Sequence, residues 1–132
     1  MGKNACQSIL TKISSLSRMY VDDRSLEDRR KESLRVFKKY PDRVPCIVEP
    51  GSSRAPSIRK RKYLVPKDVA FSQLQMVIRQ QIDIRPEKAL FMFIANRTLP
   101  QGTSTVGEIY DLHKSKEDSL LYITYDLESV FG

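Results

Sequence analysis

Apolar residues recur at two different spacings along the chain, and the change between them separates the predicted elements. Leu26, Leu34 and Phe37 lie on one face at helical spacing while cations fill the other face, which predicts an amphipathic helix over 25–39. Ser25 followed by two acids is typical of a helix start, and Tyr40-Pro41 is typical of a helix end.

From residue 44 onward the pattern is that of short strands. Residues 44–48 and 62–65 are apolar and β-rich, and the turn-forming stretch 49–57 separates them, which predicts an antiparallel hairpin. Because a proline cannot donate to a ladder, Pro45 is expected near the start of its strand.

The second half predicts a helix, a strand, a short helix and a last strand. The helix begins at Asp68 as its cap and ends at Arg85-Pro86, with an apolar face of Phe71, Leu74, Val77, Ile78 and Ile82. Residues 89–94 are apolar at nearly every position, which predicts a strand covered on both faces. A loop over 96–102, a short helix around Val106 and Ile109, and a strand over 120–125 complete the order.

A hairpin, a crossing helix and two further strands form the pattern of the ubiquitin-like β-grasp. We therefore expect an α+β fold with a four-stranded mixed sheet, preceded by one or more N-terminal helices. Residues 25–132 form the predicted domain, and residues 1–24 form an extension. The extension is open to several interpretations: a mobile segment, an amphipathic helix on a membrane, a mitochondrial-type presequence, or a myristoylated start at Gly2.

The charge is divided unevenly along the 132 residues. Residues 1–66 hold 16 Lys+Arg and 7 Asp+Glu, whereas residues 67–132 hold 7 and 9. An acidic partner should therefore approach the N-terminal half, although a solvated basic surface explains such clusters equally well. The two cysteines, Cys6 and Cys46, are too few for a disulfide framework and indicate reduced thiols in a cytosolic protein.

Catalytic and metal-binding patterns are not found in the sequence. The single histidine, His113, lies in a polar stretch, and no zinc-type Cys/His spacing, phosphate-binding glycine loop or glycine-flanked serine occurs. We therefore expect no enzyme, no metal and no cofactor.

Four stretches carry a resemblance to a known family: KKYPDRVPCIVE at 38–49, KYLVPKD at 62–68, PEKALFMFI at 86–94 and LLYITYDLESVFG at 120–132. In this order they resemble the ubiquitin-like modifiers of autophagy, most closely the GABA-receptor-associated-protein branch rather than the light-chain-three branch. The resemblance covers residues 25–132.

The resemblance implies a modifier that is conjugated through Gly132 to phosphatidylethanolamine on autophagosomal membranes. Gly132 would be adenylated by an activating enzyme, passed to a conjugating enzyme and released by a deconjugating cysteine protease, with Phe131 gripped by these enzymes. Without a Cβ, a glycine can enter a narrow active site. The implied location is the cytoplasm, and the autophagosome membrane after lipidation.

The resemblance also implies that receptors bearing an aromatic-x-x-aliphatic motif bind along the second strand in two pockets. The residues matching the aromatic pocket are Glu32, Val36, Pro45, Ile47, Lys62, Leu64 and Leu120. Those matching the aliphatic pocket are Tyr63, Val65, Pro66, Leu74, Val77 and Ile78. Arg43, Lys60 and Lys62 would contact acids of the motif. Because neighbours in a strand face opposite ways, Tyr63 and Leu64 cannot line the same pocket.

Several positions depart from the family pattern, among them Arg79-Gln80-Gln81, the loop at 49–61, the loop at 96–102 and Ser119. These departures and the added N-terminus leave open a peptide-binding adaptor that is never conjugated. The uneven charge leaves open a basic protein that binds nucleic acid or tubulin on microtubules. No recognised nucleic-acid motif is present, so specific nucleic-acid binding is not expected.

Overall fold

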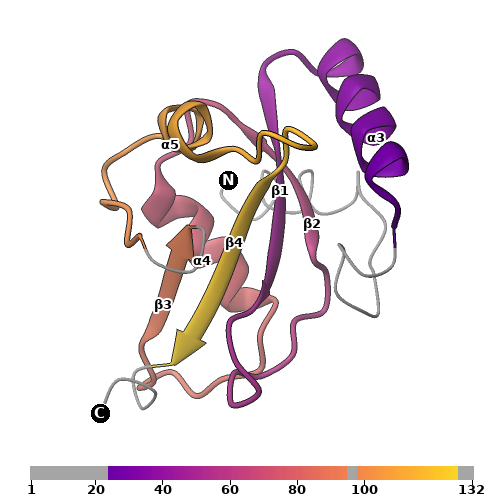
Figure 1. Cartoon of the computed structure of the whole chain (residues 1–132). Coiled ribbons are helices and arrows are strands. Elements are labelled where there is room, and N and C mark those ends of the chain that lie inside the picture. Colours follow the sequence, from indigo (N-terminus) through magenta and orange to yellow (C-terminus); the bar gives the residue numbers. More distant parts are fainter. Residues whose placement is uncertain (1–23, 95–97, 128–132) are drawn as a thin grey trace.

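The computed structural model describes residues 24–94 and 98–127, so all of the predicted N-terminal extension except Arg24 lies outside the described residues. Seven elements follow one another along the chain (Figure 1). They are α3 (Leu26–Lys39), β1 (Arg43–Pro50), β2 (Lys62–Pro66), α4 (Phe71–Gln80), β3 (Leu90–Ile94), α5 (Val106–His113) and β4 (Leu121–Leu127).

The four strands form one mixed sheet in the order β2-β1-β4-β3. The predicted hairpin is confirmed, because β1 pairs with β2 antiparallel, with Pro45 opposite Leu64. β1 and β4 are parallel, and β3 and β4 are antiparallel. The two edges of the sheet are thus β2 and β3 (Figure 1), and the predicted β-grasp is confirmed.

The sheet separates two hydrophobic clusters. Alternate residues of the central strands, such as Val48 of β1 and Ile123 of β4, join Phe71 and Ile78 of α4 in the main core. On the opposite face, Ile47 and Leu120 form a small cluster with Tyr122 packed against it. The period of two along each strand produces this division, since successive side chains point to opposite faces.

The first described helix begins as the sequence predicts. The Ser25 side chain accepts a hydrogen bond from the Asp28 N–H at 3.1 Å, which satisfies one of the free amides of the first turn. At the other end, Lys38 and Lys39 lie in the last turn, where cations complement the helix dipole. On its inner side, Phe37 packs edge-on against Tyr110 of α5, with ring centroids 5.9 Å apart.

The predicted bounds of the second helix are wrong at both ends. Its N-cap is Ala70 rather than Asp68, because carbonyls of the 102–104 segment take the first amides: Phe71 N–H donates to Ser104 O and Ser72 N–H to Gly102 O. The helix ends at Gln80, and Ile82 instead bridges to Ile58 in the β1–β2 connection.

The prediction that 89–94 is covered on both faces is also wrong. β3 is an edge strand in which Leu90, Met92 and Ile94 are buried, while Phe91 and Phe93 are half-buried. The strand looked uniformly apolar because its outer face carries aromatic rings instead of polar residues. The short helix is confirmed as α5, which Thr105 caps by accepting from the Glu108 N–H at 3.2 Å. The last strand begins at Leu121, one residue later than predicted.

Pro45 occupies a position in β1 where no amide is required. The Val48 N–H donates to Arg61 O at 2.7 Å, so hydrogen-bonded pairs alternate from there and Pro45 faces Leu64 in a non-hydrogen-bonded pair. Pairing with β4 starts only at Cys46. Within the described ranges, none of the helices is both long and apolar enough to cross a bilayer.

Candidate functional site

A pocket of about 240 Å³ opens between α3, the β1–β2 hairpin and the residue that precedes β4. All seven residues of the predicted aromatic pocket line it, and they come from four separate parts of the chain. The lining residues are Arg24, Glu32, Arg35, Val36, Pro45, Cys46, Ile47, Lys62, Tyr63, Leu64 and Leu120. The fold therefore brings the whole predicted set together in one cavity.

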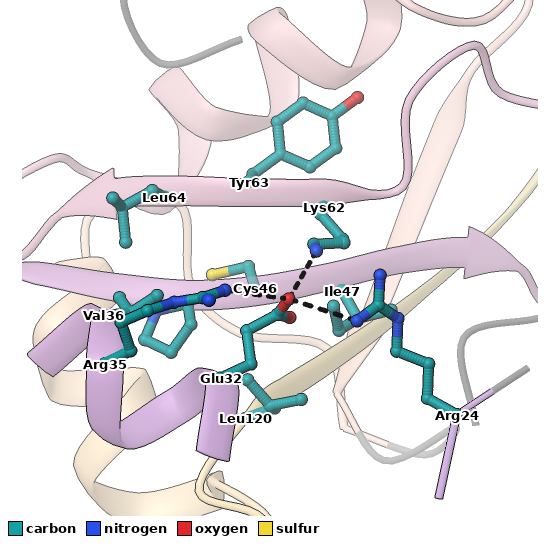
Figure 2. A pocket seen from close by; sticks show the side chains of 11 residues that line it. Arg24, Glu32, Arg35, Val36, Cys46, Ile47, Lys62, Tyr63, Leu64 and Leu120 are labelled. Carbon is teal, nitrogen blue, oxygen red and sulfur yellow. Dashed lines mark hydrogen bonds and ion pairs between the residues drawn. The ribbon is translucent and has the colours of Figure 1, made fainter. Parts of the chain in front are cut away.

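One carboxylate organises the charges of this pocket (Figure 2). Glu32 Oε2 accepts from Lys62 Nζ at 2.7 Å, and each side chain is only 10% exposed. The same oxygen lies 3.6 Å from Arg24 Nη1 and 3.9 Å from Arg35 Nη2. Among the described residues that line the pocket, three cations thus surround one acid beside apolar walls.

The apolar walls come from residues on the outer face of the sheet and from α3. Ile47, Leu64 and Leu120 are each at most 2% exposed, and Val36 on α3 is half-buried. An aromatic side chain suits such a lining, because its ring can bury apolar area while a polar edge remains near Glu32.

The alternation along β2 assigns its neighbouring residues to different sides of the sheet. Figure 2 shows the Tyr63 ring and the Leu64 side chain on opposite sides of β2, with Leu64 toward the pocket. Tyr63 belongs to the main core, and its hydroxyl donates to Lys60 O at 2.6 Å. The two side chains therefore face opposite ways, as the sequence predicts, but both residues border the same pocket, so the prediction that they cannot line one pocket is wrong.

The main chain of β2 has the same alternation. Since Val48 pairs with Arg61, the residues Tyr63 and Val65 also bond to β1. The main-chain groups of Lys62 and Leu64 consequently point to the other side, toward the outer edge of the sheet. A strand that added to this edge would lie directly beside the pocket.

The predicted aliphatic set lies in the core rather than around a described cavity. Tyr63, Val65, Leu74 and Ile78 are at most 1% exposed and all belong to the main cluster. Val77 is 6% exposed, and Pro66 is half-buried at the end of β2. Four of the six predicted residues thus share the main core, and neither Val77 nor Pro66 belongs to that cluster.

The three cations predicted to meet acids are spread along β2 and its partner. Lys62 is within the pocket and bound to Glu32, and Lys60 precedes β2. Arg43 stands opposite Pro66 at the far end of the hairpin. Its guanidinium lies 5.6 Å from the centre of the Tyr40 ring, and its buried Nη1 has no hydrogen-bond partner among the described residues.

Four lining residues were not predicted for this pocket: Tyr63 was assigned to the aliphatic pocket, and Arg24, Arg35 and Cys46 were assigned to neither. Arg35 was detectable, since it lies three residues after Glu32 on the same helix face. Arg24 precedes the helix and carried no periodic signal. Cys46 contributes from the core side at 1% exposure, and burial raises the pKa of its thiol, so that the reactive thiolate is disfavoured.

The described part of the chain contains no cluster of three or more His, Cys, Asp or Glu residues able to hold a metal ion. The described lining of the pocket combines one paired carboxylate, cations and apolar walls. Such a lining can bind an aromatic group and an acidic neighbour, which is recognition chemistry.

A family model for "Autophagy protein Atg8 ubiquitin like" matches residues 28–132. The chain belongs to this family. Atg8 proteins are ubiquitin-like proteins of autophagy, which agrees with the resemblance found in the sequence. The match begins within α3 and includes every residue of the aromatic pocket except Arg24.

Among solved structures, the crystal structure of Trypanosoma brucei ATG8 is similar to this chain. The identity is 28% and the TM-score is 0.73, and the alignment covers 86% of this chain and 97% of the trypanosome chain. The similarity therefore extends over nearly the whole relative, including the sheet and the helices around it.

Two predicted residues of the Atg8 tail lie outside the described residues. Phe131 and Gly132 follow β4, whose last described residue is Leu127. Their roles stay predictions. Arg79, one of the departures from the Atg8 pattern, is used inside the molecule, since its Nη2 donates to the carbonyls of Arg85, Pro86 and Lys88.

Proposed function

We propose that this chain is an autophagy modifier that is conjugated through Gly132 to phosphatidylethanolamine and binds receptor peptides of the form aromatic-x-x-aliphatic. The observation that carries the peptide half is the pocket beside an edge strand. Its seven predicted lining residues surround one cavity of about 240 Å³, and Leu64 turns its main chain toward the open side of β2.

In the proposed complex the peptide adds as a strand along β2. Main-chain hydrogen bonds to Lys62 and Leu64 supply affinity, and side-chain pockets supply specificity. The aromatic residue enters the pocket between α3 and the hairpin. The aliphatic residue lies farther along β2, over Pro66 and Val77, with Val65, Leu74 and Ile78 beneath it.

The cations around the pocket favour the binding of an acidic peptide. Arg24, Arg35 and Lys62 surround the single carboxylate of Glu32, and Arg43 lies at the other end of the hairpin. Acids on either side of the aromatic residue would therefore meet cations, and electrostatic attraction would increase the association rate. This attraction weakens as salt concentration rises.

The lipid half rests on family membership and on the Phe131-Gly132 pair of the sequence. Gly132 would be the acyl group transferred, through the activating and conjugating enzymes of the autophagy system, to the amine of the lipid. A deconjugating cysteine protease would reverse the linkage. The protein would then move from the cytoplasm to the autophagosome membrane.

The test of conjugation is the intact mass of the chain after reaction. The purified chain is incubated with ATP, the activating and conjugating enzymes and liposomes containing phosphatidylethanolamine, beside Gly132→Ala. We expect a mass gain of one lipid in the parent chain and none in the variant. With enzymes proven on another substrate, an unchanged parent mass would favour an unconjugated peptide-binding adaptor.

The test of peptide binding compares two leucine truncations. Leu64→Ala removes a wall of the pocket, whereas Leu112→Ala alters a leucine of α5 that is 79% exposed. We expect Leu64→Ala to weaken an aromatic-x-x-aliphatic peptide by about 30-fold, the loss typical of an anchor site, and Leu112→Ala to leave it unchanged. Equal affinities would refute the pocket assignment. Tubulin binding that survives Leu64→Ala would indicate a separate basic surface.

A further inference from the structure

One buried carboxylate outside the pocket connects the parts of the chain that form its two walls. Asp118 lies in the turn between α5 and β4 and is 1% exposed. Its Oδ2 accepts from Arg29 Nη1 at 2.8 Å and from the Tyr122 hydroxyl at 2.5 Å. Its Oδ1 accepts from the Leu120 N–H at 3.0 Å. Three donors from α3, the turn and β4 thus meet at one side chain.

The main chain of the same turn is held by α3 as well. The Ser33 hydroxyl donates to the Asp118 carbonyl, and Arg30 Nε donates to the Glu117 carbonyl at 2.6 Å. On α3, Ser33 directly follows Glu32 and lies about one turn before Val36, and Arg29 lies about one turn before Ser33. The helix that supplies one wall of the pocket is therefore fastened to the turn that precedes Leu120.

The residue between Asp118 and Leu120 has an unusual backbone. Ser119 has a φ of 61°, in the left-handed region that residues with a Cβ rarely adopt. The Tyr110 hydroxyl donates to its carbonyl at 2.5 Å, and its own N–H donates to Ser115 O at 2.9 Å. A strained residue persists where its surroundings over-determine it, and here it directly precedes Leu120, which lines the pocket.

We propose that Asp118 is a positioning residue for the aromatic pocket. It sets the separation between the α3 wall, carrying Glu32 and Val36, and the opposite wall at Leu120, and thereby selects for an aromatic side chain. The inference rests on the proposed peptide function and deepens it. Asp118 touches no bound peptide itself, since its side chain is fully covered.

The chemistry requires a carboxylate at this position. All three partners are donors, and burial, followed by its hydrogen bond to Asp118, raises the pKa of Tyr122 so that its hydroxyl stays protonated. An asparagine has the same shape but would offer one oxygen and one NH₂ group. That NH₂ group would face a donor, either Leu120 N–H or the Arg29 guanidinium, and one contact would be lost.

The experiment is a double-mutant cycle between the chain and its peptide. Asp118→Asn is compared with Asp111→Asn, an exposed aspartate of α5, using a parent peptide and two variants with alanine at the aromatic or at the aliphatic position. Replacing the aromatic residue of the peptide by alanine costs a certain factor in affinity, and we expect this factor to be about fivefold or more smaller with Asp118→Asn than with the parent chain. The factor lost on replacing the aliphatic residue should stay within about twofold of its value in the parent chain. Asp111→Asn should behave as the parent chain.

Aromatic discrimination is the ratio of the affinities for the parent peptide and for the peptide with alanine at the aromatic position. If a folded Asp118→Asn chain keeps the full discrimination of the parent chain, the proposal is wrong. If Asp118→Asn does not fold, Tyr122→Phe and Ser33→Ala each remove one contact and keep the carboxylate. Each is expected to reduce aromatic discrimination by about twofold to threefold. Unchanged discrimination in both would equally overturn it.

The failure of the peptide function can be told apart from the failure of the positioning role. If the parent chain binds none of the three peptides, the proposed function is wrong. The positioning role is then read from the free chain by nuclear magnetic resonance. We expect Asp118→Asn, or Tyr122→Phe in its place, to accelerate exchange of the Leu120 amide and to move the methyl resonances of Val36. An unchanged Leu120 amide and unmoved Val36 methyls would contradict it.

Discussion

The two edges of the sheet are treated differently by the rest of the chain. At β3, Ile94 and Thr98 exchange two main-chain hydrogen bonds, of 2.8 and 3.1 Å, and Gln75 Nε2 donates to Leu90 O at 2.9 Å. At β2, no described residue forms a bridge on the outer side of Leu64. Exposed edges invite strand addition, and natural proteins usually block them. An edge strand that no described residue bridges at Leu64, beside a pocket, is therefore consistent with a binding role.

The cavities beside the two edges also differ in their lining. The one beside β2 has a buried ion pair and apolar walls. A second cavity of about 190 Å³ lies between α4 and β3 and is lined by Ser72, Gln75, Met76, Arg79 and Leu90. Two of its residues, Gln75 and Arg79, already use their side chains to bind carbonyls of this chain.

The largest expected effect is on stability, and it distinguishes a residue of the main core from a residue of the aromatic pocket. Ile78→Ala removes a side chain that is 0% exposed in the main core, and we expect the free energy of unfolding to fall by about 3–4 kcal/mol. In the folded fraction the peptide affinity should fall only about threefold, since Ile78 lies beneath the proposed aliphatic contact. Urea unfolding and calorimetric titration measure the two quantities.

Leu64→Ala is the matched comparison for Ile78→Ala. It should destabilise the fold less, because its side chain already borders a cavity, but it should weaken the peptide far more. The reverse ranking of the two affinities would place the dominant anchor over α4 instead of at the aromatic pocket.

The next largest effect on stability is expected at the ion pair between Glu32 and Lys62, beside β2. Glu32→Gln removes the carboxylate that pairs with the buried ammonium of Lys62, and we expect a loss of about 2–3 kcal/mol in the free energy of unfolding. Adding Lys62→Met should restore most of that loss, because the pair is then absent as a whole. A double variant as unstable as Glu32→Gln alone would contradict this account.

A smaller effect is expected at the blocked edge. Gln75→Ala removes the hydrogen bond to Leu90 O, which should lower the free energy of unfolding by about 1 kcal/mol and promote self-association through β3. The control is Gln80→Ala, an exposed side chain of the same helix. Sedimentation velocity measures the association, and identical monomeric profiles for both variants would show that Gln75 does not protect this edge.

The smallest effect concerns the turn that supports the pocket. Ser119→Gly removes the Cβ at a φ of 61°, and we expect the free energy of unfolding to rise by about 0.5–1 kcal/mol. The flexibility that glycine adds to the unfolded chain makes this rise smaller than the full cost of the strained backbone. Ser119→Ala keeps the Cβ and should show no gain. Thermal unfolding of the two variants measures the difference. Equal unfolding midpoints for Ser119→Gly and Ser119→Ala would indicate that the turn carries no strain.

The sequence predicted the elements whose signals are local. Ser25 capping α3, the turn-rich stretch before β2 and the apolar periodicity of α5 all depend on residues close to one another. The aromatic pocket was reached differently, through the resemblance to the Atg8 family, since its walls come from distant segments.

The wrong predictions share a cause, which is the contribution of distant residues. Asp68 had the chemistry of a cap, but the carbonyls of Gly102 and Ser104 satisfy the start of α4. The apolar run of β3 could not reveal that it lies at an edge. Likewise, Arg29 and Asp118 are 89 residues apart, so no pattern in the sequence joined them.

The most direct test of the central claim is to record which main-chain amides respond when an aromatic-x-x-aliphatic peptide binds. Amide exchange of the chain, measured residue by residue with and without the peptide, reports on both edges at once. We expect new protection at Lys62 and Leu64 in β2 and no change at Met92 in β3. Protection at Met92, with Leu64 unchanged, would place the peptide on the other edge and contradict the account.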